Sequence, residues 1–415
     1  MTYTAYKYRL YPTKSQKTLL TKTFGCVRYV YNRSLAIKSA LYQKEKKGIS
    51  VFQLTNEMAK WKDLEETVWL KEVNSQALQM SLRYLDIAYT NFFKKRATFP
   101  KFKSRCDSQS FCNPQNTTIN WREKRIYIPK FRGGLKAVLH RKFDGKIKNS
   151  TVSKTPSGKY FISILVESET VYPKAKKPRE DKTLGIDLGI KDYATFSDGT
   201  VVQNPKYFTK KLKQLKRQQR KLSRKKKCSN NRNKQRLRVA KIHEKVTNAR
   251  KDFLHKLTCS IVENQDYSSV AIEDLDVKKM LEKGRKNKLS RHIADAGWGL
   301  FRQLLTYKCE KTGKNLLVIG RFEPSSKLCL CGYLNKSLTL KDREWDCPSC
   351  KSHHKRDELA AKNIKRFAFC KQNTYKNSAS SKQTKNLVGQ ELPEFTLLET
   401  RVSESLKKEA SMALA

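Results

Sequence analysis

Three acidic residues, far apart in the sequence, have the type and the local setting that suit metal chemistry. Asp187 lies in TLGIDLG, Glu273 in VAIED, and Asp357 in RDELAAKNI. In the first two segments the apolar residues alternate, so that each acid shares a strand face with a very small neighbour, Gly185 or Ala271. We expect these small neighbours to leave room for a metal ion and a phosphate. Convergent carboxylates of this kind can hold a pair of Mg²⁺ ions that activate water for phosphodiester hydrolysis.

The same acids also have a simpler interpretation. Asp187 and Glu273 would merely end strands, and Asp357 would cap the last helix, where the helix dipole favours a carboxylate. For any one acid alone, the structural role is the commoner one. Three acids in this order, in two strands and at the start of a helix, favour a metal site.

Four cysteines form a second group with metal-ligand spacing. Cys347 and Cys350 are spaced Cys-x-x-Cys, and Cys329 and Cys331 precede them with fifteen residues between the pairs. Two such pairs predict one structural Zn²⁺ with four thiolate ligands and no open position. The first pair is one residue shorter than usual, which would strain its turn and could weaken zinc affinity. His353 or His354 could substitute for a ligand.

The composition of the chain indicates what kind of molecule it binds. The 415-residue chain has 89 Lys and Arg against 38 Asp and Glu, a formal charge of +51. So dense a positive charge repels itself unless a polyanion neutralises it, and nucleic acid is the expected counter-charge. A membrane surface is the alternative, but no apolar run is long enough for a spanning helix. The N-terminus lacks the apolar core of a secretory signal, so we expect a reducing cytoplasm or nucleoid and free thiols at the other cysteines.

The pattern of the first half predicts a small β-barrel interrupted by a helical domain. Residues 3–11 alternate as a strand does, residues 13–98 are helical in period, and residues 111–170 are strand-like again.

The second half predicts an α/β domain. Its expected parts are a strand at TLGIDLG, a hairpin at Asp198-Gly199, a long basic helical region at 206–264, a strand at VAIED, a polar loop at 278–292 and a helix at 298–311. Residues 206–227 hold twelve Lys or Arg and no acid, which suits binding to phosphates. Aromatics among basic residues, as in Phe92-Phe93-Lys94-Lys95, could stack on bases, although such aromatics are more often core residues.

Taken together, these motifs resemble the TnpB family, RNA-guided nucleases of insertion sequences related to type V CRISPR effectors. The match runs from YRLYPTKSQKTLLTKTFGCVRYVYNRSLA through FPKFKSR, GIDLGIKDYATFSDG, IEDLDV and the cysteine insert to RDELAAKNI. The resemblance implies an α+β multidomain protein that binds a guide RNA from the element and cuts double-stranded target DNA, with base pairing reading the sequence.

The resemblance also implies a division of the chain and a role for each group. A wedge-like β-barrel would comprise 1–12 and 101–178, a helical recognition insert 13–100, an RNase H-like (RuvC) nuclease domain 179–324 and 356–370, a zinc ribbon 325–355 and a disordered tail 371–415. Asp187, Glu273 and Asp357 would be the catalytic Mg²⁺ ligands, for two ions. Cys329, Cys331, Cys347 and Cys350 would hold one structural Zn²⁺.

Two departures from the family pattern stand beside the shortened cysteine pair. The family commonly reads Asp-Arg-Asp-x-Asn-Ala-Ala, whereas this chain has Lys355 in place of the first Asp and Leu359 in place of the Asn. Three readings of function follow. The first is an active endonuclease. The second is a guide-dependent DNA-binding regulator with weak or no cutting, and the third is a transposase that joins DNA strands. The sequence leaves the oligomeric state open.

Overall fold

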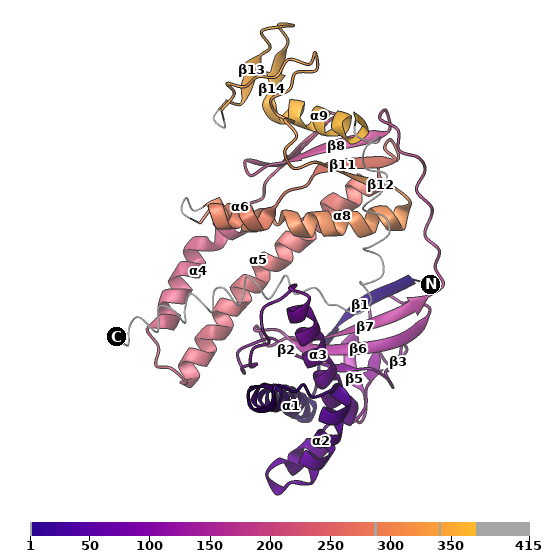
Figure 1. The fold of residues 1–415 in the computed structure, drawn as a ribbon, viewed down its shortest axis with the longest axis vertical. Helices are drawn as coiled ribbons and strands as arrows, with labels where there is room; N and C mark the ends of the chain where they lie inside the picture. The colour runs from indigo at the N-terminus through magenta and orange to yellow at the C-terminus, as the bar shows by residue number, and fades with distance from the viewer. Residues whose placement is uncertain (1, 286–288, 340–341, 371–415) are drawn as a thin grey trace. The chain divides into compact units, whose positions relative to one another are not determined.

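The computed structural model describes residues 2–285, 289–339 and 342–370. Helices and strands divide into two compact units, one before Val171 and one from Val171 onward (Figure 1). The predicted α+β class is confirmed. The expected tail, 371–415, lies outside the described residues.

The first unit contains one antiparallel sheet of seven strands in the order β2-β6-β7-β1-β5-β4-β3. The longest pairing joins β1 and β7 over nine residues, from Thr2 opposite Ser168 to Leu10 opposite Tyr160. The strands are β1 (Thr2–Leu10), β2 (Gln109–Asn113), β3 (Thr118–Asn120), β4 (Arg125–Tyr127), β5 (Leu135–Val138), β6 (Lys146–Lys154) and β7 (Tyr160–Ser168).

Helices fill the sequence between β1 and β2 and share a hydrophobic core with the sheet. They are α1 (Lys14–Glu45), α2 (Val51–Asp63), the 3-10 helix η1 (Glu65–Glu72) and α3 (Ser75–Phe93). Thr13 and Ser50 start α1 and α2 with capping boxes, in which the Gln three residues later returns a bond to the cap. Phe24 of α1 packs against Phe111 of β2, with ring centroids 5.4 Å apart.

The second unit is built on a five-stranded sheet in the order β10-β9-β8-β11-β12. The strands are β8 (Thr183–Leu188), β9 (Asp192–Phe196), β10 (Val201–Gln203), β11 (Ser269–Glu273) and β12 (Asn315–Ile319). β8, β11 and β12 run parallel, whereas β9 pairs antiparallel with both β8 and β10. The predicted Asp198-Gly199 turn is confirmed: Gly199 has φ +90°, and the Phe196 N–H donates to the Thr200 carbonyl.

Helices cover both faces of this sheet. They are α4 (Tyr207–Ser223), α5 (Asn230–Glu263), α6 (Val277–Lys283), α7 (Leu289–Ala296), α8 (Trp298–Thr312) and α9 (Arg356–Cys370). Leu184, Ile186, Val270 and Ile272 point to one face, where they pack in a single core with residues of α5 and α8. Figure 1 shows α9 on the opposite side of β8 and β11 from α8.

The predicted basic helical region at 206–264 is confirmed, as the two helices α4 and α5. One expectation for this unit was wrong: the stretch 278–292, expected as a polar loop, contains α6 and the start of α7. Apolar residues inside the charge run explain the difference, because Met280 and Leu281 pack against the core and Ile293 is buried. Asp276 caps α6 by accepting from the Lys279 N–H.

A buried carboxylate holds α4, α5 and α7 together. Asp295 of α7 accepts from the Phe208 N–H at the start of α4 and pairs with Arg250 of α5 at 3.0 Å. Removing one partner would leave a buried charge unpaired, which is strongly destabilising.

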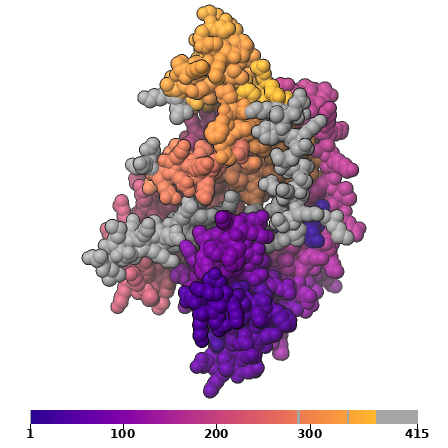
Figure 2. Space-filling model, in the orientation of Figure 1, coloured from indigo at the N-terminus to yellow at the C-terminus, as the bar shows by residue number. Residues whose placement is uncertain are grey.

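Between β12 and α9 the chain forms a small ribbon with its own hairpin, β13 (Glu344–Asp346) and β14 (His353–Lys355). In Figure 2 these residues are orange, next to the yellow end of the described chain. Among the described residues, no helix has the length and apolar content needed to cross a bilayer.

Candidate metal centres

Asp187 and Glu273 lie at matching ends of neighbouring strands. The parallel register pairs Ile186 of β8 with Ile272 of β11, and the two acids come one residue later on each strand. Because side chains alternate across a strand, both acids project to the face opposite the apolar core. Two carboxylates are thus brought side by side from segments far apart in the sequence.

Helix α9 covers this acidic face and carries Asp357 in its first turn. A Cβ on Gly185 would lie 2.1 Å from the Ala361 carbonyl oxygen of α9, so only glycine allows the helix this close to β8. Ala271 is buried in a cluster with Ile364 of α9. The prediction that these small residues leave room for metal and phosphate was therefore wrong, because α9 fills the space beside them.

The carboxylates interact electrostatically. Burial, followed by the charges of Glu273 and Asp357, raises the pKa of Asp187 to about 7, whereas Arg356 acts in the opposite direction. Burial likewise raises the pKa of Glu273. Closely spaced carboxylates that raise one another's pKa form a site of concentrated negative potential, which a divalent cation would relieve.

The three acids interact with one another but are less tightly clustered than the four cysteines. Among the described residues, the four cysteines form a group whose ligand atoms all lie within 4.8 Å of one another, and the three acids do not. Asp357 also lies 3.8 Å from Arg343 of the ribbon.

The acids that follow Glu273 are already neutralised. Asp274 accepts from Arg302 at 2.5 Å and from Arg321 at 2.7 Å, and Arg321 also reaches Asp276 at 3.1 Å. In the described part of the chain Glu273 has a neutral partner instead, the hydroxyl of Ser325, which donates to Oε1 over 2.6 Å. Sequence reasoning missed Ser325, because nothing local links a ribbon serine to a strand more than fifty residues earlier.

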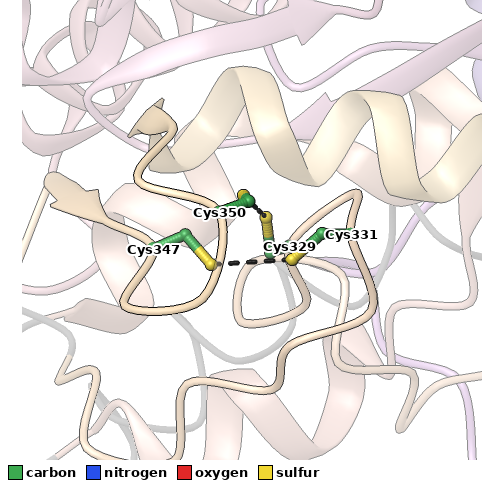
Figure 3. Close-up of side chains that lie close together, drawn as sticks. All are labelled: Cys329, Cys331, Cys347 and Cys350. Carbon is green, nitrogen blue, oxygen red and sulfur yellow. Dashed lines mark hydrogen bonds between the residues drawn. The ribbon is translucent and has the colours of Figure 1, made fainter.

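The predicted cysteine site is assembled. Cys329, Cys331, Cys347 and Cys350 place their four Sγ atoms within 4.8 Å of one another, and two of the pairs are 3.5 and 3.6 Å apart (Figure 3). Four sulfurs around a tetrahedral Zn²⁺, each about 2.3 Å from the ion, would lie about 3.8 Å apart, so the residues fit zinc. The short Cys-x-Cys spacing does not keep either thiol out of the cluster.

Neighbouring groups and burial shift the pKa values of these thiols. The hydrogen bond with the Ser352 hydroxyl lowers the pKa of Cys350 to about 6, whereas burial raises the pKa of Cys329 to about 12. The Nε2 atom of His354 lies 3.0 Å from Cys329 Sγ, and His354 is therefore a hydrogen-bonding neighbour of the cluster. Metal binding requires thiolates, so zinc would hold all four in the deprotonated form.

Leu359, the first departure from the family pattern, has a clear structural role. It is 2% exposed and packs in the ribbon's own apolar cluster with Cys329, Leu338, Trp345 and Cys347. Lys355, the second departure, is exposed on β14 opposite Glu344 of β13. Leu359 thus joins α9 to the ribbon, and Lys355 lies at the surface.

Family models match three parts of the chain. The model described as "Helix-turn-helix domain" matches residues 1–47, where the structure has one strand and a single long helix. The model described as "Probable transposase" matches residues 163–284, and the one described as "Cas12f1-like, TNB domain" matches residues 298–364.

Curated relatives match nearly the whole chain. A protein of Streptomyces pristinaespiralis named "Putative RNA-guided DNA endonuclease" is 40% identical over 364 residues, covering 87% of this chain and 88% of its own. Another from Escherichia coli K12, "Putative RNA-guided DNA endonuclease InsQ", is 36% identical over 375 residues, covering 87% and 91%.

A solved structure shares the fold. The cryo-EM structure of the Cas12f1-sgRNA-target DNA complex matches with a TM-score of 0.51 at 14% identity, covering 84% of this chain and 82% of that one. A "TnpB-like protein L79" of Acanthamoeba polyphaga mimivirus is also similar, at 24% identity over 86% of this chain. On the extent and identity of the curated matches, the chain belongs to the TnpB family, as its sequence motifs predicted.

Proposed function

We propose that this protein is an RNA-guided DNA endonuclease that hydrolyses phosphodiester bonds in guide-matched double-stranded DNA. The observation that carries the proposal is the placement of Asp187, Glu273 and Asp357 on facing elements of one sheet and one helix. Burial, together with the charges of Glu273 and Asp357, raises the pKa of Asp187, which supports a shared site of negative potential. Family membership and the shared fold support the same reading.

The three carboxylates would hold Mg²⁺, because oxygen ligands that are partly buried and repel one another suit a hard divalent cation. When bound, Mg²⁺ supplies the activation of water and the stabilisation of the leaving oxygen. The chain's own contribution is to hold the carboxylates on rigid elements, with Ser325 orienting Glu273.

The basic surface would hold the guide RNA of the element and the DNA backbone. Helix α4 carries its Lys and Arg side chains around a single buried residue, Leu215, so most of its charge faces solvent. Binding by such contacts weakens steeply with salt and does not read base sequence. Sequence choice would then rest on pairing between guide and target.

The finer division of the chain belongs to the same proposal. The seven-stranded sheet would be the wedge, the helices between β1 and β2 the recognition part, and the five-stranded sheet with α9 the RuvC-like nuclease. A parallel core flanked by an antiparallel hairpin supports the last assignment. We also propose a prokaryotic cytoplasmic location, since the zinc site requires reduced thiols.

The test is cutting of a plasmid library by the protein purified with the RNA that flanks its gene. Cutting is expected with Mg²⁺ and guide RNA, and is expected to vanish with EDTA, without RNA, or in Glu273→Ala. Glu263→Ala is a matched control, because Glu263 is an exposed acid at the end of α5. Tight guided binding without cutting in the unaltered protein would contradict the proposal and establish the DNA-binding regulator instead.

A further inference from the structure

One short turn connects the zinc ribbon, α9 and Glu273. Residues 324–328 lie between β12 and the first ribbon cysteine, and the Leu328 N–H donates to the Pro324 carbonyl at 3.1 Å. Within this turn Ser325 is 8% exposed, and its hydroxyl donates to Glu273 at 2.6 Å. The turn therefore delivers a hydrogen-bond donor to a carboxylate on another element.

Asn363 of α9 holds the same turn from its other side. Its side chain is fully buried, and its amide nitrogen donates to the carbonyls of Ser325 at 2.7 Å and Leu328 at 2.6 Å. Both partners are carbonyl oxygens, which fixes the orientation of the amide. Asn363 comes less than two helical turns after Asp357, so the helix that carries one acid also fixes the turn that contacts another.

The end of the turn leads directly into the cysteine cluster. Cys329 follows Leu328, and its N–H donates to the Tyr333 carbonyl at 2.8 Å. Its thiol lies among the four clustered sulfurs, and the cluster packs on Leu359 of α9. Folding of the ribbon around its metal would therefore restrict the position of Ser325.

From this arrangement we infer that Ser325 is a positioning residue for Glu273, and that the folded ribbon sets the position of Ser325. The hydroxyl donates to Oε1, which leaves Oε2 and the second lone pair of Oε1 for a metal ion. A carboxylate held in this way loses less conformational freedom when it binds the ion. This inference rests on the proposed function, because it takes Glu273 to be a metal ligand.

Metal binding without nucleic acid gives a test that does not depend on cutting. Mn²⁺ is titrated into the full-length, zinc-loaded protein, and the EPR signal of free Mn²⁺ is recorded. Ser325→Ala is expected to weaken Mn²⁺ binding about 10-fold. Ser325→Thr keeps a hydroxyl and is expected to restore binding to within about 3-fold.

The control is Ser337→Ala. Ser337 is an exposed ribbon serine whose hydroxyl donates to Asn335 of its own loop at 2.8 Å, and this variant should bind Mn²⁺ as the unaltered protein does. Unchanged binding in Ser325→Ala would overturn the inference. So would a Thr variant as weak as the Ala variant, because the effect would then come from packing.

A double-mutant cycle tests the dependence on the ribbon. Cys350→Ser removes an exposed zinc ligand and should weaken Mn²⁺ binding to about the level of Ser325→Ala. Adding Ser325→Ala to Cys350→Ser should then cost less than about 2-fold more, because the hydroxyl is already misplaced. If the double variant instead weakened Mn²⁺ binding by the product of the two single effects, the ribbon and Ser325 would act separately.

Asp187→Asn separates failure of this inference from failure of the proposed function. If Asp187→Asn loses Mn²⁺ binding while Ser325→Ala keeps it, the inference alone is wrong. If Asp187→Asn binds Mn²⁺ as tightly as the unaltered protein, the ion lies elsewhere and the carboxylate site itself is wrong.

Discussion

The cysteine cluster and the carboxylate site share α9 and the turn before Cys329, yet they are built in different ways. The four cysteines come from two turns of one short insert, and their sulfurs lie within 4.8 Å of one another. The three acids come from β8, β11 and α9, and they interact mainly by repulsion. The first site is local, closed and complete in its ligands, as a structural zinc site is.

The second site exists only when the whole unit is folded, because its acids come from three separate elements. The fold holds like charges near one another there, while Arg302 of α8 and Arg321 pair with the following acids, Asp274 and Asp276. We propose that the ribbon's contribution is to fix α9 and Ser325, while the acids do the chemistry. Changes to each site should therefore have different consequences.

The largest expected effect is the loss of DNA cutting in the Asp187→Asn variant. Losing one of three metal carboxylates should reduce the initial rate of guided plasmid cleavage by about three orders of magnitude or more. Guide RNA binding, which depends on distant basic residues, should change less than about 2-fold. Asp198→Asn, at an exposed turn of the same unit, should cut normally; equal loss in both variants would show a general defect.

Removal of the metal from the ribbon should come next. Cys347→Ser places a hydroxyl at a fully buried zinc-ligand position and should lower the zinc content from about one per chain to none. Both the melting temperature and the cutting rate should fall, since α9 and Ser325 lose their support. Elemental analysis and thermal unfolding measure this, with the exposed Cys106→Ser as control. Full zinc content in Cys347→Ser would contradict the ligand assignment.

Restoring the family's residue at position 359 should harm this chain. Leu359→Asn puts an amide into the apolar cluster of the ribbon and should lower the free energy of unfolding by about 2–4 kcal/mol. Chemical denaturation measures the change, and Leu330→Asn, at a half-exposed ribbon leucine, should be nearly neutral. A Leu359→Asn protein that is equally stable and cuts faster would show that Leu359 reduces the activity of this chain.

The pKa of Asp187 predicts a dependence of stability on pH in the metal-free protein. The folded state keeps its proton up to about pH 7, whereas the unfolded state loses it near pH 4. Between these values the folded state binds more protons, so the contribution of this group to stability falls as pH rises, and it levels off above 7. Asp187→Asn stays neutral and lacks this contribution.

Thermal unfolding at several pH values checks this. The melting temperature of Asp187→Asn minus that of the unaltered protein should grow from pH 4 to pH 7, and Mg²⁺ should reduce the difference. A difference that does not change with pH would mean that Asp187 is ionised without cost in the folded state.

The smallest expected effect is at Lys355. Because this side chain is exposed on β14, Lys355→Asp should change the free energy of unfolding by no more than about 0.5 kcal/mol. It places a carboxylate opposite Glu344, so any change should be a slight destabilisation that salt removes. A large loss of cutting would instead give Lys355 a role that its exposed position does not indicate.

Local patterns predicted much of this molecule, and distant contacts account for most of what they missed. The cysteine pairs, the Asp198-Gly199 hairpin and the strands around Asp187 and Glu273 follow from spacing and alternation over a few residues. The bond from Ser325 to Glu273 and the close approach of α9 to Gly185 join segments far apart in sequence, which no local pattern encodes. Helices α6 and α7 were missed because dense charge hid the few apolar residues that pack on the core.

The most direct test of the central claim is to find where a divalent metal sits on the polypeptide. Fe²⁺ can replace Mg²⁺ and, with ascorbate and peroxide, cuts the backbone beside its ligands, and mass spectrometry maps the cuts. The carboxylate site predicts cuts near Asp187, Glu273 and Asp357 that excess Mg²⁺ suppresses and that Asp187→Asn lacks. Cuts that Mg²⁺ suppresses elsewhere, with none at these three positions, would contradict it.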